Sequence, residues 1–191
     1  MLGRWGNSGS DDTSAWHLPP RMIGGYVAGP LLVGRTDQVT MFARQVVAYP
    51  DGVELEIEAH ARGPLPEGAS DEDDDDQDDE PGHIGHVGYA RLGGHRQLRF
   101  HVRFGDGREA ALDDEAGLRS GLGPMVSVIA GETSSGGPHG EDVRQRLWIW
   151  PLPPSGPFTL TCSWPRRDLP ESVIVLDGDA IRAAAERATP F

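Results

Sequence analysis

The chain has 191 residues and a single cysteine, Cys162, and both facts limit its architecture. A chain of this length fits one domain and buries about 70% of the surface that its unfolded form exposes, so its core needs no covalent staples. One cysteine allows neither an intrachain disulfide nor a CxxC metal site. All 17 basic residues are arginine, and the absence of lysine excludes mechanisms that need a Schiff-base or P-loop lysine.

The net charge of −13 is concentrated in one run, because nine of the ten residues 71–80 are acidic. The rest of the chain carries 21 acidic and 17 basic residues and lacks the basic surplus that neutralises phosphates, so we expect no nucleic-acid binding. The first residues lack the apolar segment of a secretory signal, and no stretch approaches the roughly 18 apolar residues that span a bilayer. The sequence therefore predicts a cytoplasmic protein without membrane contact.

Composition divides the chain into an arm and one domain. Residues 1–21 are rich in Gly, Ser, Asp and Pro, which predicts a flexible N-terminal arm, and residues 22–191 form the domain. The first predicted strands cover residues 30–35 and 39–49, and Pro50-Asp51-Gly52 predicts the turn that follows. A disordered acidic loop is predicted at about residues 64–86.

Two stretches show the clearest alternation of apolar and polar residues, 53–62 and 97–104. This period of two predicts half-buried strands, each with one face in water. The polar face of the first stretch carries Glu54, Glu56 and Glu58, and that of the second carries arginines and a histidine. Opposite charges on adjacent strands attract, so we expect the two strands to pair antiparallel, with the acidic insert as their connection.

The second half of the chain adds further short strands and a helix. Gly105-Asp106-Gly107 predicts a hairpin turn into residues 108–112, because Asp-Gly favours tight turns between strands. Later strands are predicted at residues 125–130, 147–152, 158–164 and 173–176, and an alanine-rich helix capped by an aspartate at 180–188. The sequence thus predicts an all-β fold, a two-sheet antiparallel β-sandwich (immunoglobulin-like or related) with one short C-terminal α-helix.

A block near the C-terminus reads Leu147-Trp-Ile-Trp-Pro-Leu-Pro-Pro-Ser-Gly-Pro-Phe-Thr-Leu-Thr-Cys-Ser-Trp-Pro165. It resembles a family of actinobacterial hypothetical proteins with the pattern WxWPLPPxGPxxxxCxWP, and residues 39–57 and 104–108 are similar to that family too. The resemblance implies a shared fold and no site residues, since no activity is established for the family. The acidic insert departs from the shorter linker expected there.

Two groups of residues are candidates for metal chemistry. His83, His86 and His95 could bind zinc or nickel, since neutral imidazoles suit such metals, and the alternative is that they are surface histidines. Counted from Asp71, the acidic run lacks the glycine and the glutamate that an EF-hand loop needs. We interpret the run as a solvated loop.

Trp148 and Trp150 are the candidate partner-binding residues, because residues two apart on a strand project to one face. They form either a core cluster between the sheets or an exposed binding platform. Cys162 shares the apolar face of its strand with Leu160 and Trp164, so we expect it in the core.

No combination of residues in the sequence predicts a catalytic or cofactor-binding site. The leading hypothesis is therefore a non-enzymatic binding or protein-interaction module with a protein partner, and the acidic run favours a basic one. The alternatives are a metal-dependent enzyme or metal-binding protein that uses His83, His86 and His95, and a structural subunit.

Overall fold

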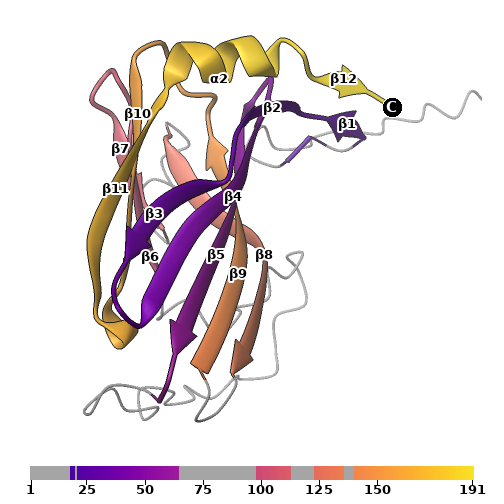
Figure 1. The fold of residues 1–191 in the computed structure, drawn as a ribbon. Helices are drawn as coiled ribbons and strands as arrows, with labels where there is room; N and C mark the ends of the chain where they lie inside the picture. The colour runs from indigo at the N-terminus through magenta and orange to yellow at the C-terminus, as the bar shows by residue number, and fades with distance from the viewer. Residues whose placement is uncertain (1–17, 20, 65–97, 113–122, 136–139) are drawn as a thin grey trace, which may run out of the picture.

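The computed structural model describes residues 18–19, 21–64, 98–112, 123–135 and 140–191 (Figure 1). They form an all-β sandwich of antiparallel strands with one short α-helix near the C-terminus, which confirms the predicted fold class. No helix among them is long and apolar enough to cross a membrane. The predicted acidic loop and most of the predicted N-terminal arm lie outside the described residues and stay predictions.

The larger sheet has the strand order β2-β4-β5-β9-β8, and β3 pairs with β4 beside β2. Its strands are β2 (Gly25–Ala28), β3 (Leu31–Arg35), β4 (Val39–Tyr49), β5 (Gly52–Arg62), β8 (Met125–Ser135) and β9 (Gly140–Trp150). Tyr49 and Gly52 pair across the β4–β5 turn, where the sequence predicts a reversal of the chain. The centre of the sheet is therefore three long strands, each of eleven residues.

The smaller sheet has four strands in the order β11-β10-β6-β7. They are β6 (Arg99–Arg103), β7 (Glu109–Ala111), β10 (Pro157–Trp164) and β11 (Leu169–Asp177). The predicted hairpin is confirmed, because the Phe104 and Arg108 backbones close the turn from β6 to β7 with a 2.8 Å hydrogen bond. A short 3-10 helix, η3 (Pro165–Arg167), joins β10 to β11.

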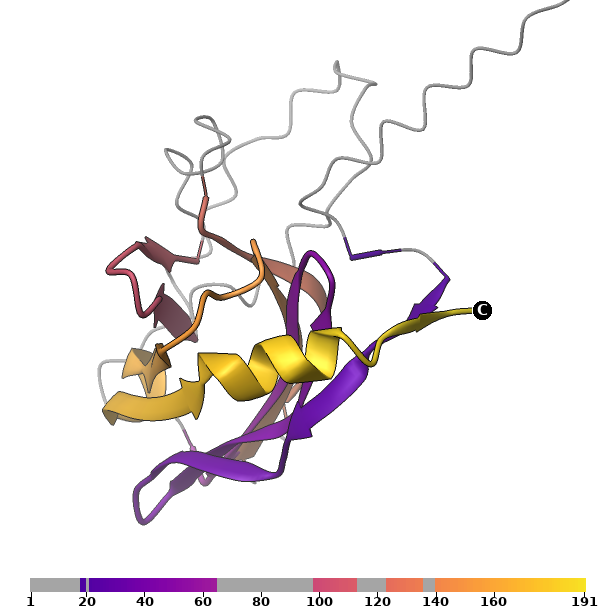
Figure 2. The same cartoon turned by 90° about the horizontal axis from the view of Figure 1, so that it is seen from above.

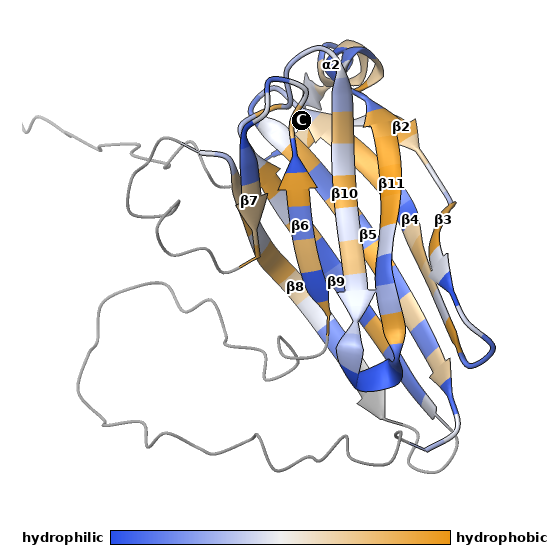
Figure 3. Cartoon of the chain, turned by 90° about the vertical axis from the view of Figure 1, so that its left-hand side faces the viewer, coloured by the Kyte–Doolittle hydropathy of each residue, from blue (hydrophilic) through white to orange (hydrophobic). Residues whose placement is uncertain are grey.

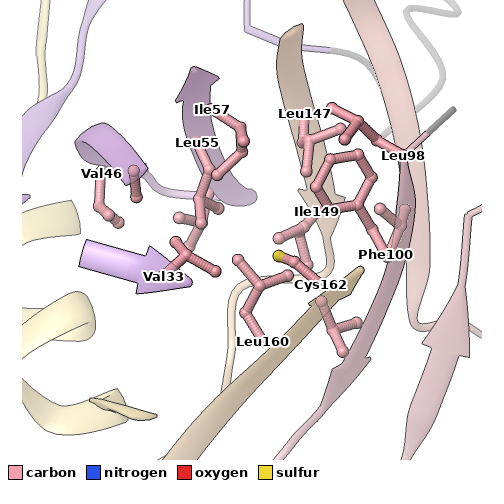
Figure 4. Close-up of a cluster of buried hydrophobic side chains, with 14 of the residues drawn as sticks. Val33, Val46, Leu55, Ile57, Leu98, Phe100, Leu147, Ile149, Leu160 and Cys162 are labelled. Atoms are coloured by element: carbon pink, nitrogen blue, oxygen red, sulfur yellow. The ribbon is translucent and has the colours of Figure 1, made fainter. Parts of the chain in front are cut away.

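The core lies between the two sheets and consists of the inward-facing residues of their strands (Figure 4). Leu55 and Ile57 of β5 and Leu147 and Ile149 of β9 come from the larger sheet, and none of them has exposed surface. The smaller sheet contributes Phe100 and Val102 of β6 and Phe158, Leu160 and Cys162 of β10. The alternation of apolar residues thus selects the buried face of each strand, as expected for half-buried strands.

The helix α2 (Gly178–Ala185) covers one end of the sandwich (Figure 2). Asp177 caps it, since the Asp177 carboxylate accepts a 2.9 Å hydrogen bond from the Asp179 backbone N–H. Ile181 and Ala184 are buried, and α2 contacts β2 and β4. After the helix, β12 (Thr189–Pro190) pairs with β1 (Met22–Ile23) in a separate two-stranded sheet.

The predicted pairing of residues 53–62 with 97–104 is wrong. β5 lies between β4 and β9 in the larger sheet, whereas β6 lies between β10 and β7 in the smaller one. The physical reason is that the glutamates of β5 form ion pairs with arginines of β4 and β9, so no electrostatic attraction favours pairing of β5 with β6. The two strands face each other through the core instead of sharing an edge.

Candidate interaction surface

The outer face of the larger sheet carries charges that neutralise one another. Arg146 Nε donates a 2.6 Å hydrogen bond to Glu54 Oε1. Arg44 Nη1 and Arg144 Nε each donate a 2.7 Å hydrogen bond to Glu58 Oε1. Burial alone would raise the pKa of Glu58, but the hydrogen bonds from the two arginines outweigh it and lower that pKa from its usual value. The glutamates at the centre of this face are thus neutralised by arginines of the same chain.

Trp148 lies on the same outer face and has no exposed surface. Its ring packs edge-on against Tyr49, with centroids 5.8 Å apart, and it leaves no room for a side chain at Gly52, where an added Cβ would lie 2.6 Å from the indole. Burial raises the pKa of the Tyr49 hydroxyl, and the charge of Glu54 adds to the effect. Trp148 therefore packs against residues of its own chain.

The two predicted alternatives for the tryptophan pair both differ from this arrangement. Leu147 and Ile149 point into the core between the sheets, and the tryptophans point the other way, as the alternation predicts. Trp148 is buried on the outer face, away from the core cluster, and Trp150 is half-buried beside Gly123. Of the two tryptophans, Trp150 is the one with exposed surface that a partner can contact.

The outer face of the smaller sheet exposes two valines of one strand, whereas the exposed large apolar residues of the larger sheet, Tyr26 and Leu32, lie on two different strands. Val173 and Val175 of β11 are 56% and 63% exposed. In the register of the sheet they lie beside Thr161 and Thr159 of β10, and these lie beside His101 and Arg103 of β6. We call this surface the β6–β11 face, and Figure 3 looks onto its sheet. Its residues are Arg99, His101, Arg103, Thr159, Thr161, Val173 and Val175.

The arginines of the β6–β11 face lack carboxylate partners. Arg99 and Arg103 are exposed, and neither makes an ion pair within the described part of the chain. His101 Nε2 lies 3.7 Å from a carboxylate oxygen of Glu109 on β7, at the border of this face. At the centre of the larger sheet, by contrast, Arg44, Arg144 and Arg146 bind glutamates, although its exposed Arg35 and Arg62, at the ends of β3 and β5, make no ion pair among the described residues.

β11 is also an edge strand of its sheet, since it has β10 on one side and, among the described residues, no hydrogen-bonded strand on the other. Its central residues Val173, Ile174 and Val175 are all β-branched. Exposed apolar edge strands are sites where another chain adds, and natural proteins usually protect them with charges, prolines or bulges. Here β3 packs against β11, with Gly34 close to Ser172, so the open part of the strand is the outer side of Val173 and Val175.

The candidates for metal or thiol chemistry are less informative. His83, His86 and His95 lie outside the described residues, as does the acidic run 71–80. No group of three His, Cys, Asp or Glu side chains that could hold a metal ion occurs in the described ranges. Cys162 is buried in the core, as predicted, and burial raises the pKa of its thiol to about 12.

An aspartate–histidine pair on the larger sheet went unnoticed in the sequence. His60 Nδ1 and Asp142 Oδ1 are 2.6 Å apart, and the imidazole stacks on Phe42. The nearest side chain recorded at His60 Nε2 is the carboxylate of Glu58, at 3.8 Å, and within the described part of the chain no hydroxyl or thiol hydrogen-bonds there. The pair thus lacks the nucleophile that acyl-transfer chemistry requires.

Comparisons with known proteins add no relative from which a function could be inferred. No family model matches the chain, and a search of curated proteins finds no match. The resemblance to the actinobacterial family therefore stays a prediction. The basic half of the β6–β11 face was visible in the sequence as the polar positions of one strand, but only the register of β6, β10 and β11 brings it together with Val173 and Val175.

Proposed function

We propose that the chain is a non-enzymatic protein-interaction module and that the β6–β11 face is its contact surface. The observation that carries the proposal is the exposure of Val173 and Val175 side by side on an edge strand, next to arginines without ion-pair partners among the described residues. Apolar groups that water surrounds in the free protein are the groups that gain most when a partner covers them.

The energies involved favour a modest but specific contact. Burying a fully exposed valine side chain contributes about 1.5–3 kcal/mol, so the exposed parts of two valines contribute about 2–3 kcal/mol together. A free-energy difference of that size changes an affinity by roughly 30- to 150-fold. Arginine is enriched in protein interfaces because its planar group both packs and donates several hydrogen bonds.

The other hypotheses drawn from the sequence do not involve the β6–β11 face. The histidines proposed for metal binding and the acidic run expected to favour a basic partner lie outside the described residues, so both ideas stay predictions. Trp150 offers a rival contact site on the other sheet. The proposal that the β6–β11 face binds a partner requires neither the tryptophan nor the metal.

The experiment compares proteins captured from a lysate of the source cells by four versions of the chain. The wild type is set beside V173E/V175E, beside W150A, and beside the matched control L32E, which changes an equally exposed apolar residue on the larger sheet (Leu32 is 61% exposed). Circular dichroism and thermal unfolding verify that each variant folds.

We expect at least one protein that the wild type, W150A and L32E capture and that V173E/V175E does not. Identical sets from the wild type and V173E/V175E would rule out the β6–β11 face. Selective loss with W150A would place the contact on the larger sheet instead. All three sites lie outside the core cluster, and the folding measurements separate a selective loss of binding from unfolding of a variant.

A further inference from the structure

The strand β6 presents a row of basic side chains on the β6–β11 face, and this row indicates the chemistry of the partner. Arg99, His101 and Arg103 occupy alternate positions of the strand, so they project to one side about 7 Å apart. Glu109 of β7 lies directly across from Arg103 in the register, and its carboxylate is 3.7 Å from His101 Nε2. Neither Arg99 nor Arg103 makes an ion pair within the described part of the chain, so both guanidinium groups are open to water.

The larger sheet shows how this protein satisfies such a row. There β5 carries Glu56 and Glu58 at alternate positions, and each lies directly across from an arginine of β9, Arg146 and Arg144. A strand of alternating glutamates thus neutralises a strand of alternating arginines, with Arg146 bound to Glu54 and Arg144 to Glu58. β6 has a single acidic residue across from it among the described residues, Glu109 of β7, because β10 places Thr159 and Thr161 on its other side.

We propose that the β6–β11 face binds an acidic, extended segment of a partner protein, an inference that rests on the proposed function. In an extended segment the side chains on one side recur about every 7 Å, which is the spacing of Arg99, His101 and Arg103. Carboxylates of the segment bind this row, and its apolar side chains cover Val173 and Val175. The threonines of β10 form the floor between the two contacts.

The overall charge of the chain does not oppose such a contact at short range. The described residues carry 15 acidic and 13 basic side chains, so the sandwich itself is almost neutral. The Debye length is about 8 Å at physiological ionic strength, so charges farther from the face than this are largely screened. The local arginine row then dominates the interaction with an incoming carboxylate.

The test uses two labelled peptides and needs no knowledge of the natural partner. One peptide alternates Glu and Val, and the other alternates Lys and Val. Binding of each to the full chain is measured by fluorescence anisotropy, and the amide shifts of β6, β10 and β11 are followed by NMR. The variants are R99Q/R103Q on the face and the matched control R35Q/R182Q, which removes two exposed arginines elsewhere.

We expect the Glu-Val peptide to bind with shifts on the β6–β11 face and the Lys-Val peptide to bind at least fivefold more weakly. R99Q/R103Q should weaken binding of the Glu-Val peptide about fivefold or more, and R35Q/R182Q less than twofold. Raising the salt concentration should weaken binding in the wild type much more than in R99Q/R103Q.

Four results would overturn the proposal. The first is failure of the Glu-Val peptide to bind. The second is equal weakening by both arginine pairs, which would indicate a general charge effect. The third is a set of shifts outside the face. The fourth is binding only after removal of residues 71–80, which would make the chain's own acidic run the occupant. If V173E/V175E still loses a cellular partner, the proposed function survives all four.

Discussion

Arg167 and Glu141 form an ion pair inside the sandwich, and breaking it should cost more stability than any surface change. Arg167 Nε and Nη2 both lie 2.9 Å from Glu141 Oε2, and the two side chains are only 6% and 3% exposed. Arg167 Nη1 also donates hydrogen bonds to the carbonyl oxygens of Gly63 and Pro64, at 3.2 and 3.1 Å. One guanidinium therefore connects η3 with β9 and with the end of β5.

The substitution R167M removes the cation and leaves the Glu141 carboxylate buried without it. Losing one partner of a buried ion pair costs about 3–5 kcal/mol, a large part of the roughly 5–15 kcal/mol that stabilises a typical domain. With an m-value of about 2 kcal/mol per molar urea, the unfolding midpoint should fall by about 2 M. Urea unfolding followed by tryptophan fluorescence measures the effect.

The double variant R167M/E141L separates the charge effect from lost packing. Replacing both partners with apolar residues leaves no buried charge, so we expect the double variant to be more stable than R167M by about 2 kcal/mol or more. R108M is the matched control, since Arg108 forms an exposed ion pair with Asp106, and its midpoint should stay unchanged. Additive losses in the double variant, or a small loss in R167M, would refute this reasoning.

Three further predictions concern single residues. Because folding lowers the pKa of Glu58, its carboxylate stabilises the fold at pH values above the pKa of the unfolded chain, and this stability is lost as pH falls through the pKa of the folded chain. E58Q should therefore flatten the decline in the unfolding midpoint below about pH 4.5. Cys162, whose pKa is raised to about 12, should resist a thiol reagent at pH 8 and react at the rate of unfolding; fast labelling of the native chain would contradict its burial. D177A should cost about 0.5–2 kcal/mol because it removes the cap of α2, whereas D177N should keep most of it, as thermal unfolding will show.

The alternation of apolar residues was sufficient to predict the fold class and most strand positions. Val53, Leu55 and Ile57 predict the buried face of β5 because every second residue of a strand faces the same way. Strand ends were harder to predict. β9 begins at Gly140, seven residues before the predicted start, since its first half places Asp142 and Arg144 in water and carries few apolar residues to reveal it.

Strand pairing could not be predicted from charge alone, because the sequence offers the glutamates of β5 more than one set of arginines. Arg99 and Arg103 are one set, and Arg144 and Arg146 are the other. The choice depends on contacts between residues far apart in the chain; Glu54 and Arg146, for example, are 92 positions apart. Local patterns carry no information about such contacts, and both pairings look equally favourable until the topology is known.

The candidate surface follows from the same competition for carboxylates. Since β5 can lie beside only two strands, its glutamates neutralise the arginines of β4 and β9 and leave Arg99 and Arg103 of β6 without partners among the described residues. Exposed arginines cost little in water, so folding alone gives no reason to pair them. They stabilise a complex only when a partner excludes water around them, and burial of the neighbouring Val173 and Val175 makes that exclusion favourable. The charges and the apolar side chains of the β6–β11 face are thus more informative together than either is alone.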